Sequence, residues 1–214
     1  MKFSEMKYER PDLAAVKDEL HALTERLKAA RDYAEAREAF LAHEAAYIHM
    51  ETQATLASVR HTIDTRDEFY DAEETFWNAA TPELDAYEDA WKGTMLESPF
   101  RKEFAAEYGD LMFINAEIAR KAFSPEIIPE SQQENELTQA YGKLIASAQI
   151  PFEGGVYTIS QLSPFKNDPD DARRLAAWQA EGAWYKEHQA EFDDIYDKMV
   201  HLRDTMGKKL GYEG

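Results

Sequence analysis

The apolar residues of this chain recur every three or four positions over long stretches. In the first stretch Leu13, Val16, Leu20 and Leu23 follow this spacing, and Asp12 stands where it could cap a helix. Such a period places the apolar side chains on one face of an α-helix. The sequence therefore predicts a mainly α fold, a multi-helix array of antiparallel helices.

Capping residues and prolines predict where later helices begin. Thr65 followed three residues later by Glu68 has the form of a capping box, which predicts a helix that continues through Trp77. Thr81-Pro82-Glu83 and Ser98-Pro99 predict two more starts, because proline is tolerated in the first turn of a helix. Apolar periodicity predicts further helices over residues 33–59, residues 110–122, and from Asp168-Pro169 to a terminating Gly211.

One segment departs from the helical pattern. Two β-prone runs, residues 148–152 and 156–159, flank Glu153-Gly154-Gly155. Glycine reaches the positive φ angles that tight turns need, so the sequence predicts one short β-hairpin at about residues 148–159. We expect this hairpin to lie against helices, because an isolated two-stranded hairpin is marginal in water.

Two prolines, Pro125 and Pro129, mark a break between helical patterns, and Ser131 with Glu134 predicts a capping box just after it. This break suggests two parts. Residues 1–124 would form an N-terminal helical subdomain, and residues 125–214 would contain the hairpin and two long helices.

Composition restricts the partners of the chain. The formal net charge of −18 repels phosphate, so nucleic acid and anionic membranes are poor candidate partners. The sequence has no cysteine, no secretion signal and no run of about 20 apolar residues. A soluble cytoplasmic protein is the default expectation.

The sequence lacks the local motif of a catalytic zinc site, although its histidines could still converge from different helices in the fold. A His-Glu-x-x-His run would put two imidazoles and a general base on one helix face, and no such run occurs. In the nearest string, residues 43–47, Tyr47 stands in place of the second histidine, which favours an ordinary stretch of helix. Asp197 with His201, and Asp18 with His21, are one turn apart and are expected to be surface contacts.

Other kinds of site find no better support. The chain has no Glu-x-x-His motif of a two-metal carboxylate bundle, although its many glutamates leave a carboxylate metal carrier as an open alternative. No P-loop lysine follows the glycines at 154 and 155, and Ser160 and Ser163 before Pro164 are expected only to start a helix. We therefore predict no catalytic, cofactor-binding or metal-binding residue in this chain.

Four blocks carry a resemblance to a known family. They are Phe3 to Asp12, Arg60 to Glu73, Tyr157 to Phe165 and Leu202 to Tyr212, and they span nearly the whole chain in order. Together they resemble the N-terminal portion of the oligoendopeptidase F-type members of the M3 zinc metallopeptidases.

The resemblance implies a function that this chain would perform only in part. In that family the leading helices form scaffold and one wall of a channel for short peptides, whereas the zinc ligands and the catalytic glutamate come later in the chain. The resemblance thus implies an inactive N-terminal piece or a natural remnant, with zinc held by an absent C-terminal catalytic domain. It also implies exposed apolar surface that could lead to self-association.

A second hypothesis belongs to a different class. The chain could be a stand-alone acidic helical module that binds a basic protein partner and has no enzymatic activity. A His-Glu-x-x-His motif encoded downstream would favour the peptidase, and a natural stop codon would favour the module.

Overall fold

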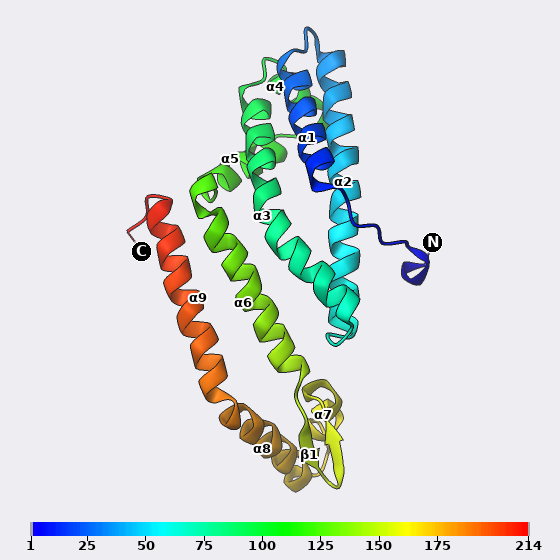
Figure 1. The fold of residues 1–214 in the computed structure, drawn as a ribbon, viewed down its shortest axis with the longest axis vertical. Coiled ribbons are helices and arrows are strands. Elements are labelled where there is room, and N and C mark those ends of the chain that lie inside the picture. Colours follow the sequence, from blue (N-terminus) through cyan, green and yellow to red (C-terminus); the bar gives the residue numbers. More distant parts are fainter. Residues whose placement is uncertain (1, 214) are drawn as a thin grey trace. The chain divides into compact units, whose positions relative to one another are not determined.

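The computed structural model describes residues 2–213, and within them it contains nine α-helices, two short 3-10 helices and one two-stranded antiparallel sheet (Figure 1). The predicted mainly α fold with a single hairpin is confirmed. The α-helices are α1 (Leu13–Lys28), α2 (Tyr33–Ile63), α3 (Glu68–Glu97), α4 (Arg101–Tyr108), α5 (Leu111–Lys121), α6 (Ile128–Ala146), α7 (Ile159–Lys166), α8 (Asp171–Glu187) and α9 (Gln189–Lys209). The strands are β1 (Ile150–Phe152) and β2 (Gly155–Tyr157), and the 3-10 helices are η1 (Phe3–Glu5) and η2 (Pro125–Ile127).

The described chain divides into two units. The first comprises the residues up to Gln132 together with those from Met206 onward, and the second comprises Gln133–Thr205. None of the described helices is both long enough and apolar enough to cross a membrane.

The first unit is built on three long helices. α1, α2 and α3 pack against one another, and α5 packs against α3. Together with Phe104 of α4, their buried side chains form two clusters, one around Phe40, Trp91 and Phe104 and the other around Leu20 and Trp77. This arrangement fixes the walls of the cavity described below.

Asp12 caps α1 as predicted, but the start of α3 differs from the prediction. Asp67, and not Thr65, is the N-cap, because its carboxylate accepts hydrogen bonds from the backbone N–H groups two and three residues later. Pro82 starts no helix, since it is buried inside α3. The buried neighbours Ala80 and Leu84 hold this part of α3 in the core, which outweighs the backbone hydrogen bond that proline cannot make.

The break at Ser98 is confirmed, although α4 begins only at Arg101. The predicted capping box at Ser131 is wrong. Ser124 caps η2 instead, and α6 follows it directly from Ile128. Proline at the start of η2 is compatible with this early start, because its missing N–H would have no helical partner there.

In the second unit the hairpin pairs Ile150 with Tyr157 and Phe152 with Gly155. The two turn residues are Glu153 and Gly154, both with positive φ, 47° and 78°. The two glycines therefore have different roles. Gly154 supplies the turn, whereas Gly155 lies in β2, where an added Cβ would come within 2.6 Å of the Tyr157 hydroxyl oxygen.

Three helix boundaries in this part of the chain also differ from the predictions. Thr158 caps α7 in a capping box with Gln161, so Ser160 and Ser163 lie within the helix. Asp170, and not Asp168-Pro169, caps α8. The predicted continuous helix is broken at His188, between α8 and α9. The chain leaves α9 through Gly211, whose φ of 87° agrees with its predicted role as terminator.

The hairpin, α7 and α8 enclose a small core of their own, formed by Ile150, Phe152, Leu162, Ala177 and Trp184. The described residues of α6 and α9, in contrast, include no buried side chain. α6 and α9 carry exposed apolar side chains, among them Tyr141, Tyr196 and Val200, and self-association through them stays a prediction.

Candidate functional site

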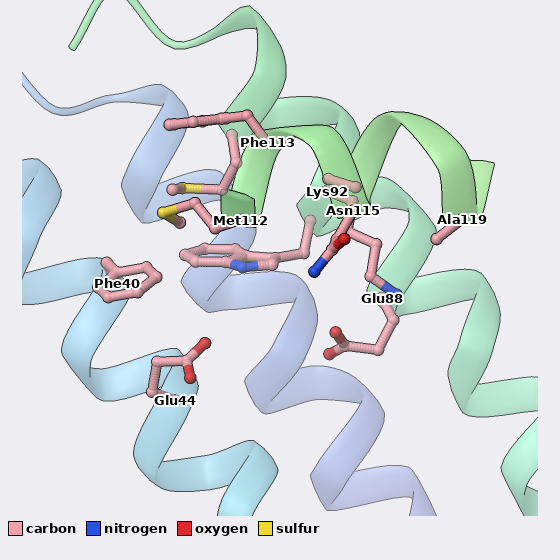
Figure 2. Close-up of a pocket in the computed structure, with 11 residues that line it drawn as sticks. Phe40, Glu44, Glu88, Lys92, Met112, Phe113, Asn115 and Ala119 are labelled. Carbon is pink, nitrogen blue, oxygen red and sulfur yellow. The ribbon is translucent and has the colours of Figure 1, made fainter. Parts of the chain in front are cut away.

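In the first unit, residues of α2, α3 and α5 line a cavity of about 250 Å³ (Figure 2). Most of its lining is apolar, with Phe40 from α2 and Met112 and Phe113 from α5. Glu44 from α2 and Glu88 from α3 also line it, and Figure 2 shows both carboxylates below Met112 and Phe113 in that view. The cavity thus combines an apolar wall with two acidic groups.

A buried histidine lies beside this cavity. His43, on α2, is 1% exposed, and its ring stacks on that of Trp91 with 3.9 Å between centroids and 2° between planes. Its Nε2 lies 3.0 Å from Glu88 Oε1, and its Nδ1 lies 3.9 Å from Glu44 Oε1. The imidazole therefore stands between two carboxylates, with the indole ring covering one of its faces.

The contact between His43 and Glu88 is short but poorly aligned for a hydrogen bond. Neither ring nitrogen of His43, nor Glu88 Oε1, has a well-aligned hydrogen bond within the described residues. Burial by itself lowers the pKa of His43, but the carboxylates of Glu44 and Glu88 oppose burial and prevail, so the pKa is raised above its usual value.

Neighbouring titratable groups share this acidic environment. Burial, and then the negative charge of Glu88, raises the pKa of the Tyr47 hydroxyl. Burial also raises the pKa of Asp85, although the nearby Lys92 ammonium opposes the shift. His43 therefore lies in surroundings where carboxyl groups outnumber cations.

Sequence reasoning placed residues 43–47 in an ordinary helix, and the structure confirms the helix. It missed the pairing of His43 with Glu88, which lies far away along the chain. A signal was available, because Leu84, Glu88, Trp91 and Met95 follow a spacing of four, three and four residues. A glutamate on such an otherwise apolar stripe indicates a buried acid that requires a partner.

A second buried acid ties the N-terminal segment to α3. Glu73 is 3% exposed and accepts hydrogen bonds from Arg10, with Nε to Oε2 at 2.9 Å, and from the hydroxyl of Tyr8. Trp77 Nε1 donates to the same hydroxyl at 3.1 Å. The hydrogen bonds from Arg10 hold the pKa of Glu73 below its usual range, and burial raises the pKa of Tyr8 to about 12. These contacts have the character of a structural anchor.

The sequence leads us to expect zinc outside this chain, and the described residues show how its own histidines are placed. No group of three or more His, Cys, Asp or Glu side chains suited to a metal occurs among the described residues. His61 has one carboxylate near it, with Nε2 3.2 Å from Asp71 Oδ1, and His43 is packed against Trp91. These residues do not fit a zinc site. His201 and Asp197 are both highly exposed, with 3.5 Å between Nδ1 and Oδ1, as expected for a surface contact.

The second unit has an apolar groove between α6 and α9. Tyr141 and Thr138 of α6, with Phe192, Tyr196 and Met199 of α9, line a space of about 460 Å³. Tyr141 and Tyr196 are 50% and 72% exposed. The groove contains no cluster of catalytic side chains among the described residues, and it has the character of a docking surface.

Comparison with known proteins gives consistent results. The family model described as the peptidase M3 N-terminal domain matches residues 3–123. No curated protein matches the chain.

Solved structures match over its whole length. A structure assigned as oligoendopeptidase F has 38% sequence identity and a TM-score of 0.96, and the match covers 100% of this chain and 38% of that one. PZ peptidase A, solved with an inhibitor, has 36% identity and a TM-score of 0.95 over 99% of this chain and 38% of that one. A structure from Bacillus anthracis strain Ames, also assigned as oligoendopeptidase F, has 32% identity and a TM-score of 0.95. That match covers 100% of this chain and 39% of the other. The chain thus spans less than two-fifths of the length of each of these proteins.

Proposed function

The chain belongs to the peptidase M3 N-terminal domain family, and we propose from this that it forms the N-terminal helical part of a zinc-dependent oligoendopeptidase. Its role there is to provide scaffold and part of the channel that admits short peptides. It supplies neither the zinc ligands nor the catalytic glutamate. The protein acts in the cytoplasm.

One observation carries this proposal. The whole chain superposes on an oligoendopeptidase F structure, yet it accounts for only 38% of that chain. The sequence contains no His-Glu-x-x-His run, so the chemistry belongs to a part of the enzyme that corresponds to the remaining length of such relatives.

The surface of the second unit supports the same role. α6 and α9 bury no side chain among their described residues, and an apolar groove runs between them. We assign this groove to contact with the catalytic part, because apolar surface of this kind normally marks an interface.

A domain exchange tests the proposal. This chain would replace the equivalent N-terminal 38% of the oligoendopeptidase F that matches at 38% identity. The hybrid should hydrolyse an internally quenched short peptide, and a chelator should abolish the activity. A matched hybrid with Tyr141 and Tyr196 both changed to Asp should lose activity, because two charges would enter the apolar groove.

The isolated chain is the control. It should cleave no peptide with or without added Zn²⁺. Chelator-sensitive turnover by the isolated chain would refute the proposal, and so would a folded hybrid without activity.

A further inference from the structure

The buried His43 is the basis of a further inference, independent of the proposed function. We propose that His43 is a charge clamp between α2 and α3. In its imidazolium form it holds the Glu88 carboxylate and fixes Trp91 in the cavity wall, and its deprotonation at alkaline pH frees Trp91 to move.

Burying Glu88 is costly without a partner for its charge. This residue is 6% exposed, and its Oε1 has no well-aligned hydrogen bond among the described residues. A buried carboxylate without compensation is strongly unfavourable. The Nε2 of His43 lies 3.0 Å from Glu88 Oε1. Because this contact is poorly aligned for a hydrogen bond, a neutral imidazole would do little to offset the cost of burying the Glu88 carboxylate. The contact therefore requires the positive charge of the imidazolium.

The charged groups around the His43 ring are mostly acidic. On α2 itself, Glu44 faces Nδ1 and Tyr47 stacks 6.2 Å away, with Glu51 beyond it. On α3, Glu88 faces Nε2. Asp85 interacts electrostatically with both Glu88 and Lys92, and Lys92 lines the same cavity as Glu88. The buried residues of α1, which packs on both helices, are uncharged, and so are the residues of α5 that line the cavity. The net charge facing the imidazole is therefore negative.

The direction of the pH effect follows from linkage. The pKa of His43 is raised in the folded state relative to an ordinary histidine, for which it is about 6.5. The clamp therefore contributes its full stabilisation below the pKa of the unfolded chain and loses it as the pH rises through the folded-state pKa. The expected transition lies on the alkaline side of an ordinary histidine.

A second histidine–tryptophan stack in the same molecule provides an internal control. His188 stacks on Trp184 with 4.4 Å between centroids and 27° between planes. Its Nδ1 lies 2.9 Å from the carbonyl oxygen of Trp184, and a backbone carbonyl carries no full charge. A property that arises from stacking alone would appear at both sites, whereas a clamp that depends on carboxylates would appear only at His43.

The experiment uses the full 214-residue chain labelled with ¹⁵N-histidine and 5-fluorotryptophan. The ¹⁵N shifts give the protonation state of His43 as the pH is raised, and the ¹⁹F shift with acrylamide accessibility reports on Trp91. We expect the Trp91 signal to move, and its accessibility to rise, at the midpoint of His43. Glu88→Gln should shift that midpoint to lower pH, whereas His188→Gln should leave it unchanged.

Measurements on the unsubstituted chain keep the proposal testable even where Glu88→Gln does not fold. A His43 that is already neutral at the midpoint of an ordinary histidine would overturn the clamp. A Trp91 signal that stays constant while His43 titrates would overturn it equally. So would an unchanged His43 midpoint in a folded Glu88→Gln variant.

Discussion

The long helices of the first unit differ from the α6 and α9 pair of the second in what they bury. α2 buries nine residues and α3 buries ten, including aromatic rings and ionisable groups, whereas the described residues of α6 and α9 bury none. All four are long and carry apolar residues at helical spacing. Helical periodicity thus predicts that a helix forms, but it does not reveal whether the apolar face is covered within the same chain.

The largest expected effects concern two buried acids, one in each unit. Glu73→Ala removes the acceptor of the hydrogen bonds from Arg10 and Tyr8 and should cost about 3 kcal/mol in the free energy of unfolding. Urea denaturation measures this. The comparable acid of the second unit, Glu181, pairs with Lys166 at 2.5 Å, and Lys166 also lies over the Trp178 ring. Lys166 is 13% exposed, whereas Arg10 is 48% exposed, so Glu181→Ala leaves the more deeply buried cation without its partner and should cost at least as much. A clearly smaller loss would contradict this comparison.

An exposed ion pair gives the control for both substitutions. Glu38 pairs with Arg26 at 2.8 Å, and both side chains are at least half exposed. Glu38→Ala should change the free energy of unfolding by no more than about 0.5 kcal/mol. A larger loss there would mean that the urea measurement does not distinguish buried acids from exposed ones.

The next effect concerns the small core of the second unit. Leu162 is fully buried against the hairpin and α8, so Leu162→Ala should cost about 3 kcal/mol. Because the described residues of α6 and α9 add no buried side chains, this loss should appear first as faster hydrogen exchange within residues 133–205. An equal increase in the rate of hydrogen exchange in α2 would show that the two units unfold together.

These elements also show how far sequence reasoning reaches. The hairpin and most helices could be predicted because each depends on local period and turn chemistry. Helix starts are less secure, since Thr65 and Asp67 both offer a capping side chain and only the folded backbone selects Asp67. Pro82 misleads because burial in the core outweighs its local preference. The His43–Glu88 pair joins two helices, so no local pattern contains it.

A smaller effect should appear in acid. The hydrogen bonds from Arg10 lower the pKa of Glu73 in the folded state. This group therefore contributes stability above its unfolded pKa of about 4.3 and loses it as the pH falls through the folded value. Denaturation midpoints measured from neutral to acid pH should fall more steeply for the natural chain than for Glu73→Gln. If the denaturation midpoints of the two proteins fall in parallel, groups other than Glu73 cause the loss of stability in acid.

The smallest effect on stability is expected at the uncovered face of α9. Tyr196 and Val200 are 72% and 46% exposed, so Tyr196→Ser with Val200→Ser should change the free energy of unfolding by no more than about 0.5 kcal/mol. The same pair should lower self-association measured by sedimentation, because it removes exposed apolar area from α9. Asp197→Ser, an exposed change on α9, should not lower association. If the double variant instead unfolds readily, these side chains stabilise the chain itself, and the contrast between covered and uncovered helices fails.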